Sequence, residues 1–258
     1  MKRLYSLLFF LAIFGTVQAA AQDAAAIVRQ SRNRITAATT QTRSRWVITA
    51  RNGSVTERLI DQYSKDDAAG NGRTMIVFQQ PASVAGTRFL SMDTGRGGSN
   101  QWIFLPSLGK SRRIAASEGS GSFMATDFSY DDISSADRDA DLDTHRILRE
   151  ENLAGRACYV IESRPKDTSY QYSRMVQWID RSNNVTWRID LYDRRGDHVK
   201  TLEILELRDV QGRLSPVRTR MTTVGGGNTT INTEILRYDE AIPESVFTVN
   251  YLETGRAR

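Results

Sequence analysis

Cysteine, histidine and proline are scarce in this sequence, which has one, two and five of them in 258 residues. A single thiol, Cys158, cannot form a disulfide within the chain, so the fold depends on its apolar core. His145 and His198 lie in separate strand-like stretches, so there is no histidine pair at the spacing of zinc ligands. The prolines form no proline-rich linker, which favours one continuous domain.

Long apolar runs are also missing, except at the N-terminus. A short basic stretch followed by an almost entirely apolar run occupies residues 2–17, and Ala19 and Ala21 complete small-x-small cleavage patterns. We therefore expect residues 1–21 to be a secretory signal peptide, cleaved after Ala19 or Ala21. The run is too short for a membrane-spanning helix, which needs about 20 apolar residues. The prediction is an exported, periplasmic protein with no membrane span in residues 22–258.

Charge of one sign is not concentrated anywhere in the chain. The sequence has 35 basic and 30 acidic residues, a formal net charge of +5, and removal of Lys2 and Arg3 with the signal peptide lowers it to +3. This surplus is small and dispersed, so the sequence does not predict nucleic-acid binding.

Motifs of the common enzyme classes are absent as well. Gly109-Lys110-Ser111 resembles the end of a phosphate-binding loop, but Phe104 stands where that loop needs its first glycine. No Gly-x-Ser-x-Gly elbow occurs, and "DRDADLD", residues 137–143, is followed by neither the glycine nor the glutamate of a calcium loop. We therefore predict no catalytic residue, no metal site and no cofactor.

The sequence is rich in stretches where apolar and polar residues alternate with period two. Asp23 can cap a helix through "AAAIVRQSRNRI", and "SRWVITARNGSVTERLIDQYS" then places two strands around Asn52-Gly53, a strong hairpin signal. The strand-like stretch "HVKTLEILELRD" breaks phase between Ile204 and Leu205, which predicts a bulge. Alternating strands at short spacing indicate a single antiparallel, barrel-like domain.

One long interruption, residues 117–143, is too long to be a turn and predicts a functional loop or a short helical insertion. The stretch that leads into it, "LPSLGKSRRIAASEGSGSFMATDFSYDD", carries Lys110, Arg112 and Arg113. Two interpretations of these basic residues stay open. They are either solvated charges at a strand edge or contacts to an anionic headgroup or an acidic partner surface.

The order of several motifs gives the chain a family resemblance. "WIFLPSLGKSRRI", "GSFMATDFSYDDI", "ACYVIESRP" and "YSRMVQWID" follow one another as in the outer-membrane lipoprotein-sorting proteins. The sequence most resembles the LolA-like periplasmic branch, often encoded beside inner-membrane exporters of the resistance-nodulation-division (RND) class. The resemblance covers nearly all of residues 22–258. Ala125 and Thr126 stand where that branch commonly has Gly-Ser.

The resemblance implies a mainly β, single-domain fold, namely a half-open, strongly bent antiparallel β-barrel of the LolA/LolB type with helices covering its concave face. Residues 119–134 would form part of a movable cover, with Gly119 and Gly121 as hinges. Carriers of this kind hold acyl chains in a dry cavity, where each buried methylene contributes about 0.8 kcal/mol. The implied function is a periplasmic carrier that shuttles lipoprotein acyl chains or lipid between membranes without catalysis.

Strand parity suggests which residues line such a cavity, and the alternative for each is an ordinary core position under a helix. Lys110, Arg112 and Arg113 are assigned to headgroup or partner contact. The predicted ligand-binding residues are Trp46, Ile48, Ile76, Phe78, Phe89, Trp102, Phe104, Met124, Phe128, Val176, Trp178, Trp187 and Ile189.

Two other hypotheses stay open. The first is a non-carrier accessory protein with a filled core that docks on an RND-type exporter or another envelope complex. The second is an enzyme, which would need His145 or His198 beside a nucleophile.

Overall fold

The computed structural model describes residues 23–95, 97–135 and 138–256, so the predicted signal peptide, residues 1–21, lies outside the described residues. The helices are α1 (Ala24–Arg32), α2 (Tyr130–Ser134) and α3 (Val249–Thr254), with 3-10 turns η1 (Ala116–Glu118), η2 (Phe123–Ala125), η3 (Ala140–Leu142) and η4 (Glu244–Phe247). The strands are β1 (Thr39–Thr49), β2 (Val55–Asp66), β3 (Gly72–Gln80), β4 (Arg88–Asp93), β5 (Ser99–Leu105), β6 (Lys110–Arg113), β7 (Asp143–Leu153), β8 (Arg156–Pro165), β9 (Arg174–Asp180), β10 (Thr186–Tyr192), β11 (His198–Val210), β12 (Arg213–Thr223) and β13 (Asn228–Tyr238).

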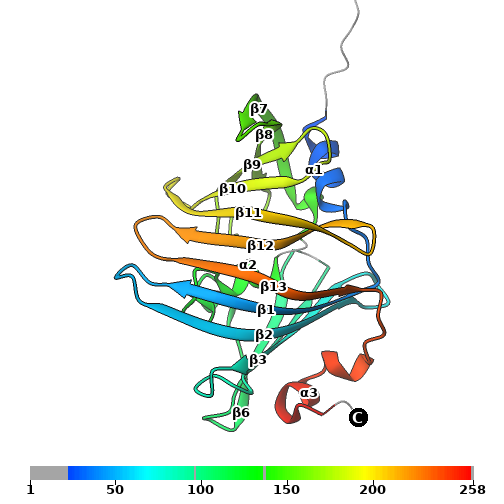
Figure 1. Cartoon of the computed structure of the whole chain (residues 1–258), viewed down its shortest axis with the longest axis vertical. Helices are drawn as coiled ribbons and strands as arrows, with labels where there is room; N and C mark the ends of the chain where they lie inside the picture. The colour runs from blue at the N-terminus through cyan, green and yellow to red at the C-terminus, as the bar shows by residue number, and fades with distance from the viewer. Residues whose placement is uncertain (1–22, 96, 136–137, 257–258) are drawn as a thin grey trace, which may run out of the picture.

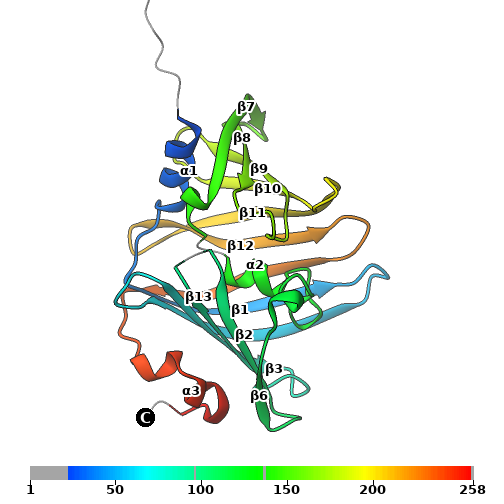
Figure 2. The same ribbon diagram turned by 180° about the vertical axis from the view of Figure 1, so that it is seen from behind.

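The described residues form one antiparallel sheet of thirteen strands, in the order β6-β5-β4-β3-β2-β1-β13-β12-β11-β10-β9-β8-β7. The sheet is not closed, because β6 and β7 at its two ends do not pair with each other. It bends so strongly that both edges turn toward the same side, which Figures 1 and 2 show from opposite directions. The expected half-open antiparallel fold is confirmed.

Local signals in the sequence produce the expected elements. The Asp23 carboxylate accepts a hydrogen bond from the Ala25 amide and caps α1. The β1–β2 hairpin turns at Asn52-Gly53, where Gly53 has a φ of +83° that glycine adopts without strain. The register of β11 against β12 shifts after Ile204, so the predicted bulge is confirmed.

The long interruption crosses the inner, concave face of the sheet. Residues 114–135 and 138–142, which we call the cover segment, are the described part of the connection from edge strand β6 to edge strand β7 and contain η1, η2, α2 and η3. In Figure 2, α2 lies in front of the strands and between the two edges. The open side of the sheet is thus covered by the chain that joins its own edges.

Both faces of the sheet carry apolar cores, but different segments cover them. On the inner face, α1 packs over β8 and β9 through Ile27 and Val28. On the outer face, the C-terminal segment with η4 and α3 packs against β3–β5, where Met75 and Leu90 are fully buried. Figure 1 shows this segment beside the lower strands. Burial on two faces means that alternation alone cannot identify the inner side of these strands.

Adjacent hairpins pack so closely that one glycine is required by space. A Cβ atom on Gly227, in the β12–β13 turn, would overlap the carbonyl oxygen of Thr49 in β1. We predict that Gly227→Ala lowers the free energy of unfolding by about 1–3 kcal/mol, as overpacking does. Gly72→Ala is the control, because its nearest neighbour would be Asp66 Oδ1 at 3.9 Å, and it should change stability by less than about 1 kcal/mol. Urea denaturation measures both, and equal effects would contradict this packing argument.

Candidate functional site

The inner face of the sheet is apolar, and side chains of the cover segment fill it. Phe123 is fully buried at its centre, with ring centroids 5.1 Å from Phe89, 5.9 Å from Phe78 and 6.2 Å from Trp46. Phe128 lies beside it, 5.6 Å from the Trp46 ring. These rings come from β1, β3, β4 and the cover segment, so one cluster joins distant parts of the sheet.

A tight turn presents the two phenylalanines to the same face. The Phe123 amide donates to the Phe128 carbonyl at 2.8 Å, and the Ser122 hydroxyl donates to the Thr126 carbonyl at 2.6 Å. The Thr126 hydroxyl in turn donates to the Phe123 carbonyl at 2.7 Å. The segment therefore folds back on itself without a long helix, and its backbone polar groups find partners while its rings are buried.

The conformation of this turn is strained at two successive residues. Met124 and Ala125 have φ values of +51° and +58°, in the left-handed region that costs a residue with a Cβ about 1–2 kcal/mol. Ala125 is one of the two positions where the sequence departs from the Gly-Ser of the resembling branch. Arg58 of β2 donates a hydrogen bond to the Met124 carbonyl and helps to hold the strained turn, and burial lowers the pKa of Arg58.

A carboxylate tethers the turn to the sheet. Asp127 accepts hydrogen bonds from the hydroxyls of Thr223 in β12 and Thr229 in β13, both at 2.7 Å. The Asp127 amide also donates to the Thr229 hydroxyl oxygen at 3.0 Å. Hydrogen bonds to a charged group are stronger than neutral ones, so this carboxylate is a principal polar attachment of the cover segment.

A second carboxylate attaches α2. Asp132 accepts from the Ser129 amide at 2.8 Å, from Gln171 Nε2 at 3.0 Å, from the Tyr172 hydroxyl at 2.8 Å and from Lys200 Nζ at 2.7 Å. Burial, together with the adjacent Asp132 charge, raises the pKa of Tyr172, which keeps the phenol protonated as a donor. The network fixes α2 to the β8–β9 loop and to β11 by polar contacts, whereas the rings beneath η2 are held by apolar packing.

The two histidines do not form a catalytic group with an accessible nucleophile. His145 Nδ1 lies 2.7 Å from the Ser163 hydroxyl, but Ser163 is fully buried and also accepts from Gln177 Nε2 at 2.7 Å. His145 Nε2 lies 2.8 Å from the Ala140 carbonyl oxygen. The ring is thus oriented by a backbone carbonyl, whereas a catalytic triad uses a carboxylate for this purpose. His198 Nε2 lies 2.9 Å from the Thr201 hydroxyl oxygen and 3.6 Å from Asp190 Oδ1, and the Thr201 hydroxyl donates to this Asp190 oxygen at 2.9 Å. The apolar inner face suits binding of apolar groups.

The structure brings most of the predicted lining residues to the inner face. Ile48 is buried, and its partner in β13 is Thr229, which bonds to the cover segment. The predicted residues found on this face are Trp46, Ile48, Ile76, Phe78, Phe89, Met124, Phe128 and Ile189. Whether they bind a ligand stays a prediction.

The expected placement of Trp102 and Phe104 is wrong. Both lie on the outer face of β5 and pack against the C-terminal segment, while Ile103 between them faces inward and is buried in the central cluster. The prediction failed because the C-terminal segment covers the outer face, so both parities of β5 are apolar. The alternate positions of β5 with the aromatic residues, Trp102 and Phe104, are therefore not the inner ones.

Val176, Trp178 and Trp187 also lie on the outer face, in a cluster with Cys158 and Val160. A bulge between Thr186 and Arg188 separates Trp187 from Ile189, which keeps the inner orientation. Guanidinium groups cover these rings, with Arg156 3.8 Å from the Trp187 centroid and Arg188 4.9 Å from that of Trp178. Arginine stacking shields this outer apolar surface in place of a helix.

Sequence reasoning missed the central residue, Phe123. It lies in a segment with no strand periodicity, and only its position in "GSFMATDF", directly before the predicted residue Met124, pointed to it. Ile103 and Met175 do occupy alternating strand positions. Period-two alternation predicts them only if the inner side of β5 and of β9 is already known. The inner-face residues that were missed include Ile60, Ile103, Ile114, Phe123, Tyr172, Met175, Leu191 and Met221.

The three basic residues of β6 do not converge on one point. Arg112 donates to both carboxylate oxygens of Glu118 at 2.9 and 3.0 Å, and Arg113 contacts Asn100 and lies 5.9 Å from the Trp102 ring. Lys110 is exposed at the β5–β6 turn. Of the three, only Arg112 has a described ion pair, and a role of the three in headgroup or partner contact stays a prediction.

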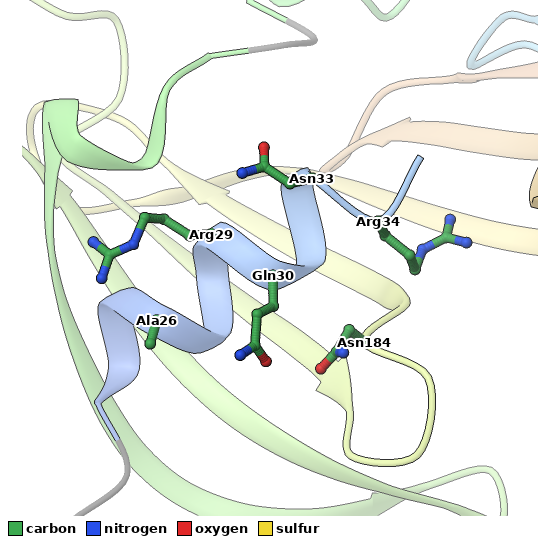
Figure 3. Close-up of a pocket in the computed structure, with 6 residues that line it drawn as sticks. All are labelled: Ala26, Arg29, Gln30, Asn33, Arg34 and Asn184. Atoms are coloured by element: carbon green, nitrogen blue, oxygen red, sulfur yellow. The ribbon is translucent and has the colours of Figure 1, made fainter. Parts of the chain in front are cut away.

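Two surface hollows lie away from the inner face. One, of about 520 Å³, lies between α1 and the β9–β10 turn and is lined by Ala26, Arg29, Gln30, Asn33, Arg34 and Asn184 (Figure 3). The other, of about 490 Å³, lies beside the β7–β8 turn and includes Arg156, Asp180 and Arg181. Neither hollow is lined by residues of the central cluster around Phe123, where side chains of the cover segment pack against the sheet. A dry cavity for a ligand on the inner face stays a prediction.

Comparison with known proteins agrees with this architecture. A family model described as an uncharacterized protein matches residues 70–254. The chain is 30% identical to a DUF1329 family protein from Desulfovibrio piger, with 90% of this chain and 100% of that chain covered and a TM-score of 0.84. No curated protein sequence matches the chain.

Two further solved structures are similar. One is a putative outer membrane lipoprotein-sorting protein domain from Vibrio parahaemolyticus, 26% identical over 89% of this chain and 98% of that chain, with a TM-score of 0.83. The other is a LolA superfamily protein from Nitrosomonas europaea, 20% identical over 90% and 100%, with a TM-score of 0.72. The open, bent sheet with its covered inner face is thus a LolA-like fold. Within this class the chain belongs to the DUF1329 family.

The strained turn yields a stability prediction. Ala125→Gly should raise the free energy of unfolding by about 0.5–1 kcal/mol, because relief of the left-handed conformation exceeds the entropic cost of glycine. Ala116→Gly in η1, which has no positive φ, is the control and should lower it by a similar amount. Thermal and urea denaturation compare the two variants. Loss of stability in both would show that Ala125 carries no strain.

Proposed function

We propose that the protein is a periplasmic carrier that binds the acyl chains of lipoproteins or lipid on its inner face, after the cover segment moves aside, and transfers them between membranes without catalysis. One observation carries the proposal. On the inner face of the open sheet, Phe123 and Phe128 of a separate segment pack against apolar side chains of the strands, so displacement of that segment uncovers these side chains. A surface filled by its own strands would offer no such space.

The energetics favour an acyl chain as the replacement. Burial of one phenylalanine side chain contributes about 1.5–3 kcal/mol, so withdrawal of Phe123 and Phe128 costs about 3–6 kcal/mol. Each methylene buried in their place contributes about 0.8 kcal/mol, so roughly eight methylenes offset that cost. An acyl chain longer than this therefore outcompetes the cover, whereas a short apolar molecule does not.

The attachments of the cover segment suit reversible movement. The Asp127 and Asp132 carboxylates accept hydrogen bonds from side chains of the sheet and of the β8–β9 loop, and Arg58 of β2 donates to the Met124 carbonyl of the segment. Polar groups released by its movement can bond to water at the open side of the sheet, so the cost is limited. Gly119 and Gly121 remain proposed hinges.

The names of the similar structures support the proposal. One of them is described as a putative outer membrane lipoprotein-sorting protein domain, and at 26% identity it spans nearly the whole chain. Residues 1–21 have the pattern of a secretory signal peptide, which supports a periplasmic location. None of the described helices is long and apolar enough to cross a membrane.

The first test is native mass spectrometry with organic extraction, on protein expressed from the full chain and purified from periplasm without detergent. Bound acyl species at near-stoichiometric level are expected, and their mass identifies the cargo class. A protein that arrives empty and also takes up no added fatty acid or lipopeptide would overturn the carrier proposal.

A second test loosens the cover segment. Asp127→Ala removes its hydrogen bonds to Thr223 and Thr229, each worth about 1.5–3 kcal/mol for a charged acceptor, and favours the uncovered state. Since the apparent dissociation constant depends on the fraction of protein in the competent state, binding of a long-chain fluorescent fatty acid should tighten by about tenfold or more, because even one of these bonds at the lower figure corresponds to about a factor of ten. Fluorescence titration measures this.

The matched control for this test is Asp239→Ala. Asp239 also accepts two hydrogen bonds, from the Ala38 amide and from Arg213, but it lies at the ends of β1 and β13 and has no described contact with the cover segment. Its substitution should leave fatty-acid affinity unchanged. Equal affinity in Asp127→Ala and the native protein would mean that Asp127 does not restrain the cover.

The second candidate function is an accessory protein that carries nothing and docks on an RND-type exporter or another envelope complex. The filled inner face favours it, since a docking protein needs no ligand space. The basic residues of β6 are the proposed contact, because Lys110 and Arg113 are exposed at the sheet edge. Charge reversal at Lys110 and Arg113 that leaves partner binding intact would count against this version.

A further inference from the structure

The most exposed apolar side chains of the described residues gather at one end of the sheet. Leu108, Val55 and Val224 are 59%, 58% and 53% exposed. They belong to the β5–β6, β1–β2 and β12–β13 turns, which are far apart in sequence. Neighbouring strands in this part of the sheet are antiparallel, so the β5–β6, β3–β4, β1–β2 and β12–β13 connections all lie at the same end of the strands. They follow one another along that end from β6 to β12. Figure 1 shows the β1–β2 and β12–β13 hairpin tips projecting to the left.

We call these four connections the apolar rim, defined by residues 50–55, 81–87, 105–110 and 223–228. The rim contains two basic residues, Arg51 and Lys110, both exposed, and no aspartate or glutamate. The next connection at this end, the β10–β11 turn, has the sequence "DRRGD" and neutralises its own charge, since Asp193 bonds to Arg195. The rim is therefore a distinct region of apolar and basic character.

The shape of the rim distinguishes between possible partners. Its aliphatic side chains stand singly on separate turns along a curved edge, and neither of the two surface hollows involves them. A protein partner would need matching pockets along this edge. A bilayer interface accepts several aliphatic side chains in parallel and attracts basic residues when its lipids are anionic.

We propose that the apolar rim docks the protein on the surface of an anionic phospholipid membrane, with Val55, Leu108 and Val224 inserted among the headgroups and Arg51 and Lys110 against the lipid phosphates. The area involved is small, so binding is reversible, as peripheral contacts of this strength are. The inference goes beyond the carrier proposal and does not depend on it, because no inner-face residue takes part.

The test is sedimentation of the protein, expressed from the full chain and purified as above, with vesicles. Vesicles of phosphatidylglycerol and phosphatidylethanolamine should bind it, and vesicles of pure phosphatidylcholine should bind it at least fivefold less. The triple substitution V55S, L108S and V224S should reduce binding to the anionic vesicles about tenfold. The pair R51Q and K110Q should reduce it severalfold and remove most of its dependence on salt.

Matched controls use exposed side chains outside the rim. The triple substitution L148S, L214S and I235S removes three aliphatic residues that are 37%, 39% and 42% exposed, and R208Q with R237Q removes two exposed charges. Both controls should bind vesicles like the native protein.

Three results would overturn the proposal: no sedimentation of the native protein with anionic vesicles, equal binding of the rim and control triples, or a dimer in solution that the rim triple abolishes while vesicles bind nothing. The last result would assign the rim to a second copy of the chain. The vesicles contain no lipoprotein, so the outcome is independent of whether the inner face carries cargo.

Discussion

The structure depends on the burial of Phe123 against the inner face of a sheet that does not close. A closed barrel fills its interior with side chains from its own strands, and an open sheet packs this face against another layer. Here the layer is short and irregular, and its central ring meets rings from β1, β3 and β4 at 5.1–6.2 Å. Because the cover segment joins the two edge strands, one set of contacts both fills the core and connects the ends of the sheet.

The cover segment contains backbone strain at its central turn. Several of its polar contacts with the sheet are made by two carboxylates, Asp127 and Asp132. Two successive left-handed residues, Met124 and Ala125, persist because hydrogen bonds and buried rings around them determine the conformation. Apolar contacts hold this segment against the strands, and hydrogen bonds to the Asp127 and Asp132 carboxylates attach it further. In the carrier proposal the cover and an acyl chain compete for the same apolar surface, so chain length would decide between them.

Sequence pattern predicted the fold well and the inner surface only in part. Alternation identifies a face when one side of the strand is wet, as the correct assignment of Trp46 and Ile48 in β1 shows, where Arg45 on the other face is partly exposed. It fails in β5, where the C-terminal segment buries the second face, and in β10, where a bulge turns Trp187 outward. Phe123 belongs to no periodic element, so its position depends on tertiary packing that no local pattern encodes.

One turn connects the proposed membrane contact with the proposed cargo site. Thr223, which holds the Asp127 carboxylate, directly precedes Val224 of the rim, and the Val224 amide donates to the Val199 carbonyl in the strand that also supplies Lys200 to Asp132. Taken together, the two proposals imply that insertion of Val224 into a bilayer would displace Thr223 and so weaken the attachment of the cover segment where an acyl chain would enter or leave.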